Sequence, residues 1–159
     1  MVPASVERLV SRSRTVLPFV VIGVLCVIAG GLVAAVVAHA PTEHEVWAVA
    51  YLVLVPGVAQ VALGVGQALL ADRVPSDRLL WSQLLTWNVG NAAVIAGTVA
   101  DASWGTALGG LLLVIALALF LANTRGARTS WLLRAYQVLV AIVLVSVPIG
   151  LIVQQVKGT

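Results

Sequence analysis

Long apolar runs, separated by short polar connectors, dominate the pattern of hydrophobic and polar positions along the chain. A helix needs about 20 apolar residues to cross the hydrocarbon core of a bilayer. Runs of about that length cover residues 17–40, 46–71, 79–100, 105–122 and 131–153. Because the connectors are short, neighbouring helices must run antiparallel. The pattern predicts an all-α integral membrane protein, with residues 1–159 forming a single domain that is a bundle of five transmembrane helices.

The composition points to the same class of protein. Of the residues, 61 % are hydrophobic and only 9 % are charged, and the mean hydropathy is +1.09. Soluble globular domains carry roughly 25 % charged residues. All basic residues except Lys157 are arginines, which is typical of a GC-rich genome, and we therefore expect a multi-pass protein of a bacterial plasma membrane.

The basic residues also predict the orientation of the chain. Loops on the cytoplasmic side of a membrane protein carry an excess of Arg and Lys near the ends of the spans. One side of the predicted bundle carries Arg8, Arg12, Arg14, Arg73, Arg78, Arg125, Arg128 and Arg134. The other side carries only Lys157. We therefore expect residues 1–16 to form a cytoplasmic N-terminal segment and the C-terminus to be external.

The first span has one alternative interpretation. The sequence AHA at residues 38–40 resembles a signal-peptidase site that follows a basic segment. However, the apolar run before it is longer than the roughly 7 to 15 residues of a signal-peptide core. We therefore expect the first span to be retained.

Polar residues inside the second and third spans lie on one face of each helix. At about 100° per residue, the four polar or small residues of span 2 fall within an arc of about 80°. These are Gly57, Gln60, Gly64 and Gln67. A similar arc of span 3 carries Gln83, Trp87, Asn91 and Thr98, with Asn88 at its edge. Since the two spans are antiparallel neighbours, the two polar faces should meet.

Depth predicts which amides meet across this interface. Gln67 and Gln83 are about equally far from the connector, and Gln60 lies at about the depth of Asn88 and Asn91. An amide without a hydrogen-bond partner in hydrocarbon costs several kcal/mol. One interpretation is therefore that the amides hold the helices together. The other is that they line a binding site, with candidate ligand-binding residues Gln60, Gln67, Gln83, Trp87, Asn88 and Asn91.

Two further motifs have ordinary structural explanations. His39, Glu43 and His44 lie in the external connector HAPTEHE, but their spacing matches no strong metal-binding pattern, and we predict no metal site. Gly105 and Gly109 form a GxxxG pattern in span 4. Such a pattern allows close helix packing, either inside the bundle or between two copies in a homo-oligomer.

Several function classes find no support in the residues. No Asp, Glu, Lys or His lies in the central part of a span, and no nucleophile is placed with a base. Cys26 is the only cysteine. The arginines lie in short connectors and form no basic face for nucleic acid. We therefore predict that the protein is not an enzyme and needs no cofactor.

The leading prediction is a non-enzymatic accessory or interaction subunit of a larger membrane assembly, with the lipid bilayer and other membrane proteins as its partners. The alternative is a small carrier or receptor that binds an uncharged or lipid-like ligand at the amides between spans 2 and 3. A third hypothesis is a metal- or haem-linked redox helper that uses His39 and His44. A cavity above about 300 Å³ lined by Gln60, Asn88 and Asn91 would favour the alternative.

Overall fold

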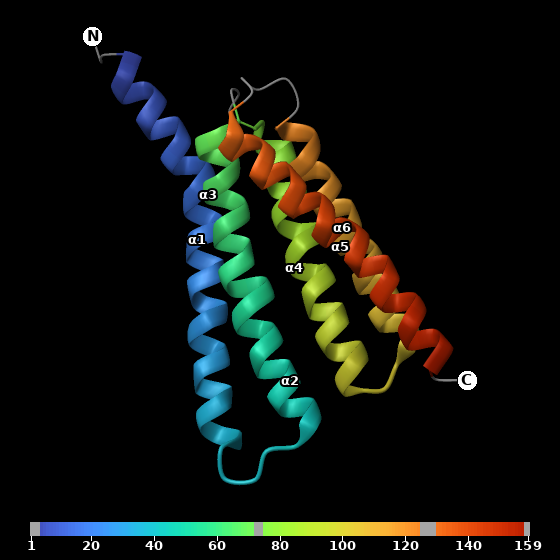
Figure 1. The fold of residues 1–159 in the computed structure, drawn as a ribbon. Coiled ribbons are helices and arrows are strands. Elements are labelled where there is room, and N and C mark those ends of the chain that lie inside the picture. Colours follow the sequence, from blue (N-terminus) through green and yellow to red (C-terminus); the bar gives the residue numbers. More distant parts are fainter. Residues whose placement is uncertain (1–3, 72–74, 125–129, 158–159) are drawn as a thin grey trace.

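The computed structural model describes residues 4–71, 75–124 and 130–157, and within these ranges the chain is helical and contains no strand. Five helical rods follow one another (Figure 1). Their elements are α1 (Ala4–Val37), α2 (Glu43–Leu52), the π-helical segment η1 (Val53–Ala59), α3 (Gln60–Leu70), α4 (Asp77–Val99), α5 (Ser103–Asn123) and α6 (Trp131–Lys157). The elements α2, η1 and α3 form one continuous helix, here called the α2–α3 helix. The predicted number and order of helices are confirmed.

Three helical stretches are long and apolar enough to cross a membrane. They are Arg12–Val37, Glu43–Leu70 and Ser103–Asn123. The α4 helix has a suitable length of 23 residues, but its amides and tryptophans make it less apolar. In α6 the described apolar stretch covers only Trp131–Val143. The helix composition is thus that of a membrane protein.

Successive helices run up and down, as Figure 1 shows. The first residues of α1, α4 and α6 lie at the same end of the bundle as the last residues of α3 and α5. Among the described side chains, Arg78 and Arg134 belong to this end, whereas Glu43 and Asp101 belong to the opposite end. Arg73, Arg125 and Arg128 of the predicted basic side lie outside the described residues. Arg78 and Arg134 thus lie at one end, as the sequence predicts, and Asp77 lies there beside Arg78.

Local sequence signals fix the start of α2 and the end of α4. At the start of α2, Thr42 and Glu45 form a capping box: the backbone N–H of Thr42 donates to Glu45 Oε2 at 2.9 Å, and that of Glu45 donates to Thr42 Oγ1 at 3.3 Å. The α4 helix ends at Val99, and Asp101, two residues later, has a left-handed φ of 50°. The backbone N–H of Ala102 then donates to Gly97 O at 2.7 Å, as in a Schellman motif. This tight turn brings α5 directly back along α4.

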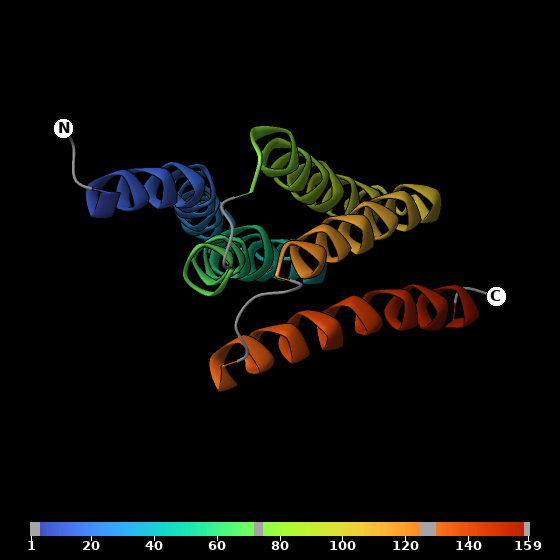
Figure 2. The same cartoon turned by 90° about the horizontal axis from the view of Figure 1, so that it is seen from above.

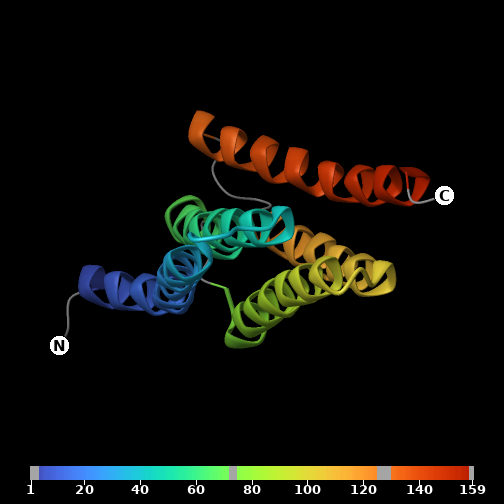
Figure 3. The ribbon, with the colours of Figure 1, turned by 90° about the horizontal axis from the view of Figure 1, so that it is seen from below.

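The helices form two closely packed pairs and one outer helix. The α1 helix packs along the α2–α3 helix, α4 packs along α5, and α6 rests mainly on α5. Views from both ends show α1 and α6 at the margins, with the α2–α3 helix between them (Figure 2 and Figure 3). Within the first pair, a Cβ on Gly23 would lie 2.8 Å from Gly57 O, so only glycine permits this approach.

The predicted N-terminal segment and the first span belong to one continuous helix. The α1 helix begins at Ala4 and continues without a break through Pro18 into the apolar run. Thr15 and Phe19 of this helix are already buried. The helix thus extends to both sides of the predicted start of the span at residue 17, and Phe19 packs against Gly64 of α3.

Candidate functional site

The polar faces of the α2–α3 helix and α4 meet at an interface that we call the seam. Few backbone atoms approach each other here, and long side chains fill the space between the two closely packed helix pairs. The residues that build the seam are Tyr51 and Gln67 on one side and Gln83, Trp87 and Asn91 on the other. Most of them were predicted from the polar faces of spans 2 and 3 in the sequence.

A reciprocal amide pair lies at the end of the seam nearest the α3–α4 connection. Gln67 Nε2 donates to Gln83 Oε1 at 3.1 Å, and Gln83 Nε2 donates to Gln67 Oε1 at 2.8 Å. Both side chains are fully buried. Each amide thus satisfies the other where water is excluded, which is the condition under which such a bond stabilises a helix pair most. The meeting of these two residues was predicted from their equal depth.

A tyrosine, and not Gln60, reaches Asn91 from the α2–α3 helix. Tyr51 Oη donates to Asn91 Oδ1 at 2.8 Å, and Asn91 Nδ2 donates to the backbone oxygen of Trp87 at 2.8 Å. The Tyr51 ring stacks on Trp47 at a centroid distance of 5.0 Å. The predicted pairing of Gln60 with Asn91 is therefore wrong: Asn91 bonds to Tyr51 and to the backbone of its own helix.

Gln60 turns instead toward α1. Its Nε2 donates to the backbone oxygen of Phe19 at 3.4 Å, which is long for a hydrogen bond. Its Oε1 is buried and has no partner. Gln60 is thus a fully buried amide with one weak bond, in clear contrast to Gln67.

Asn88 does not join the seam. Its side chain is only half-buried, and its Nδ2 donates to Leu84 O of its own helix at 2.8 Å. Back-bonding of this kind satisfies an amide within one helix and requires no neighbour. The predicted pairing of Asn88 with Gln60 is wrong for this reason.

Trp87 lies in the core, near the middle of α4. Its side chain is 2 % exposed and makes an edge-to-face contact with Phe120, with ring centroids 6.4 Å apart. Phe120 in turn contacts Phe19 at 5.5 Å. The indole Nε1 of Trp87 is buried and has no hydrogen-bond partner. An unpaired donor in such a place is uncommon in folded proteins.

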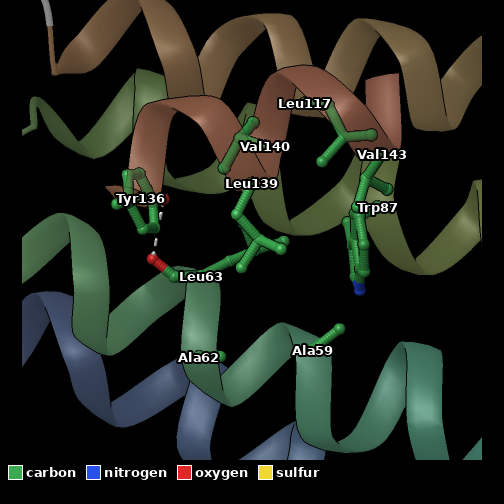
Figure 4. A pocket seen from close by; sticks show the side chains of 9 residues that line it. All are labelled: Ala59, Ala62, Leu63, Trp87, Leu117, Tyr136, Leu139, Val140 and Val143. Carbon is green, nitrogen blue, oxygen red and sulfur yellow. Dashed lines mark hydrogen bonds between the residues drawn. The ribbon is translucent and has the colours of Figure 1, made fainter. Parts of the chain in front are cut away.

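Trp87 also lines a cavity of about 240 Å³ between four helices (Figure 4). The lining residues are Ala59, Ala62, Leu63, Trp87, Leu117, Tyr136, Leu139, Val140 and Val143. This cavity differs from the one that the amide hypothesis requires, because it is smaller than about 300 Å³ and contains none of Gln60, Asn88 and Asn91.

Tyr51 and Tyr136 are the site residues that the polar faces in the sequence did not identify. Tyr136 Oη donates to the backbone oxygen of Leu63 at 3.2 Å and so fastens α6 to α3. Its ring fills the space beside Gly66, where a Cβ would lie 2.5 Å from Tyr136 Cε2. A signal was available, since a tyrosine hydroxyl inside an apolar span needs a partner.

The remaining motifs lie away from the seam. Gly105 and Gly109 are buried against α4, so this face is not free for a second copy in a homo-oligomer. His39 and His44 are exposed. Among the described residues, no group of three or more His, Cys, Asp or Glu side chains comes together in a way that could hold a metal ion.

Comparisons with known proteins give no match: no protein-family model, no curated protein and no solved structure matches this chain.

Proposed function

We propose that the chain is a non-enzymatic protein of the cell membrane that crosses the bilayer five times and serves as an interaction subunit of a larger membrane assembly. Its N-terminus is cytoplasmic, and the outer face of α1 is the docking surface for a neighbouring membrane protein. The observation that carries this proposal is the burial of α1. In its most apolar stretch only 11 % of residues are buried, against 28 % and 39 % in the other two long apolar helices.

The spacing and size of residues on α1 support docking of another helix. Val24, Ile28, Gly31 and Ala35 follow one another at steps of four, three and four residues, and all are exposed. Helices that pack along one another repeat their contact residues at this spacing. No atom lies within 4 Å of the place where a Cβ on Gly31 would be. Glycine weakens a helix by about 1 kcal/mol relative to alanine, and an intramembrane partner that needs close approach explains its presence.

The hydrogen bonds of the seam favour this function over a carrier with an amide-lined site. The side chains of Gln67, Gln83 and Asn91 bond across or along helices. These amides therefore stabilise the bundle, and little of their hydrogen-bonding capacity remains for a polar ligand. The stabilised bundle serves as a fixed support for the exposed face of α1.

Photo-crosslinking in native membranes tests the docking surface. A photo-reactive residue at Ala35 should give one discrete protein adduct, whereas the same residue at Ala29 should give none. Ala29 is a matched control because it is also an exposed alanine of α1 but lies on the opposite flank of the outer surface. Gly31→Leu should remove the adduct at position 35, since a bulky side chain separates the helices.

Two results would contradict docking through α1: lipid adducts alone at both positions, or equal protein adducts at both. An adduct of twice the protomer mass would mean that the partner is a second copy of this chain and not a different protein. The five-span topology has its own test. Reporter fusions after Gly126 should be cytoplasmic and fusions after Thr159 external, and the five-span arrangement is wrong if both lie in one compartment.

A further inference from the structure

A groove lies between α5 and α6, near the end of the bundle where α6 begins. Its volume is about 460 Å³, and it is lined by Leu121 of α5 and by Arg134, Gln137, Val138 and Ala141 of α6. Arg134 and Val138 are exposed, so the groove opens onto the outer surface of the bundle. Pockets for small ligands have volumes of about 300 to 1,000 Å³, and this groove is therefore large enough to hold part of a lipid.

Arg134 brings an unneutralised positive charge to the groove. Its backbone N–H donates to Ser130 O at 3.1 Å, but its guanidinium forms no hydrogen bond or ion pair within the described parts of the chain. The residue also lies in the first turn of α6, where the helix dipole is positive and adds to this charge. Charge complementarity therefore favours an anionic ligand.

Two tryptophans indicate how deep in a membrane this charge would lie. Trp81 of α4 and Trp131 of α6 lie at the same end of the bundle and are 54 % and 76 % exposed. Exposed tryptophans gather where the headgroups of a bilayer meet its hydrocarbon core. Arg134 follows Trp131 by three residues, or about 4.5 Å along the helix. Its guanidinium is therefore within reach of the lipid phosphates.

Beyond the guanidinium the groove is apolar. Val138 and Ala141 lie about 6 Å and 10 Å farther along α6, and Leu121 faces them from α5. Gln137 contributes its amide to the helix contact, because its Nε2 donates to Thr124 Oγ1 at 3.2 Å and to Thr124 O at 3.4 Å. The groove thus offers a cation at one end and apolar side chains along its length. A phosphate with an acyl chain matches both parts, whereas a free phosphate matches only the first.

We propose that this groove binds one anionic phospholipid. The guanidinium of Arg134 donates hydrogen bonds to the phosphate oxygens, and one acyl chain lies against Leu121, Val138 and Ala141. Basic pockets between membrane helices hold anionic headgroups in the same way. The proposal requires that the chain lies in a bilayer, but it does not depend on the docking surface of α1, so each of the two can fail without the other.

Native mass spectrometry of the full chain tests the charge. The probes are phosphatidylglycerol and phosphatidylcholine with the same acyl chains, added at equal concentrations to delipidated protein in a mild detergent. Wild-type protein should bind one phosphatidylglycerol about tenfold more tightly than phosphatidylcholine, because only the former has a net negative charge. Arg134→Gln should reduce this preference to about one. Arg78→Gln should leave it unchanged, since Arg78 is an exposed arginine in the first turn of α4 at the same end but does not line the groove.

Arg134→Lys separates charge from folding. It keeps the positive charge but loses the planar fork of donors that suits a phosphate. It should therefore retain part of the preference for phosphatidylglycerol. A lysine variant without any preference, despite an unchanged unfolding midpoint in detergent, would contradict a site that depends on charge.

Two further measurements separate a lipid from a free anion. A large excess of inorganic phosphate should not displace phosphatidylglycerol from the wild-type protein. Ala141→Phe fills the apolar part of the groove and should weaken the binding of both lipids about tenfold. Ala135→Phe is the matched control, because Ala135 is an exposed alanine of α6 that does not line the groove, and it should bind as wild type does.

Four results would overturn the proposal. The first is equal binding of the two lipids by the wild-type protein. The second is an equal loss of preference in Arg78→Gln and Arg134→Gln, which would indicate a general attraction to the basic end. Displacement of the lipid by inorganic phosphate would indicate a site for a free anion, and wild-type binding by Ala141→Phe would show that no acyl chain lies in the groove.

Discussion

The α4 helix takes part in two interfaces that are held together in different ways. Toward α5 it presents glycines, and the backbones nearly touch: a Cβ on Gly109 of α5 would lie 2.6 Å from both Gly90 O and Val94 N of α4. Toward the α2–α3 helix it presents Gln83 and Asn91, which reach across a wider gap through hydrogen bonds of 2.8–3.1 Å. The α4 helix thus packs through close backbone contact on one face and through side-chain hydrogen bonds on the other.

The two interfaces should therefore tolerate different substitutions. Two backbones in contact cannot make room for even one methyl group, because neither can move without shifting its whole helix. Hydrogen-bonded side chains are more adaptable in shape, but a lost partner leaves a buried polar group unsatisfied. The glycine interface should therefore be sensitive to volume, and the seam should be sensitive to pairing.

The largest expected effect is on the glycine interface. Gly109→Ala should lower the free energy of unfolding by about 3 kcal/mol or prevent folding, because the new methyl group meets backbone atoms on α4. Chemical unfolding in detergent measures the change. Gly31→Ala is the matched control on α1, where a Cβ meets nothing within 4 Å. This control should be neutral or stabilise by up to about 1 kcal/mol. Equal losses in both variants would show that the close backbone contact does not make the α4–α5 interface sensitive to volume.

A smaller effect is expected when the amide pair of the seam is broken. Gln67→Leu and Gln83→Leu should each destabilise by about 1 to 2 kcal/mol, because each leaves a buried amide without its partner. The double variant should cost clearly less than the sum, since it leaves no unsatisfied amide behind. A double-mutant cycle measures this coupling, and strictly additive losses would mean that the two amides do not stabilise one another.

The smallest effect is expected at Gln60, on the same helix and equally buried. Gln60→Leu should change the free energy of unfolding by less than about 0.5 kcal/mol or increase it, because it removes an unsatisfied oxygen and only one long hydrogen bond. The same unfolding assay applies. A loss as large as that of Gln67→Leu would show that Gln60 Oε1 has a strong hydrogen-bond partner in the membrane.

The helix positions could be predicted from sequence because apolar length alone sets them. The pairing of Gln67 with Gln83 was also predictable, since α3 and the start of α4 are regular helices joined by a short connector. The prediction for Gln60 failed because depth along two helices says nothing of a third: Gln60 bonds to Phe19 O of α1. Tyr51, which lies before η1 in the α2–α3 helix, bonds to Asn91 instead.

The cavity could not be predicted in the same way. Trp87 was recognised as a polar-face residue, but the space beside it is bounded by side chains from α3, α4, α5 and α6 together. No spacing within one helix indicates how four helices leave a gap. Likewise, whether the indole N–H has a partner depends on neighbours distant in sequence, and only the packed structure provides that information.

The tight turn at Asp101 has a consequence for the order in which the bundle assembles. It joins α4, the less apolar helix, to the highly apolar α5 with only Ala100 to Ala102 between them. Contacts between segments so close in sequence form rapidly and cost little loop entropy. We expect α4 and α5 to enter the bilayer together as a hairpin, in which α5 covers the glycine face of α4 from the start. The amides of α4 would form their hydrogen bonds later, when the α2–α3 helix packs against them.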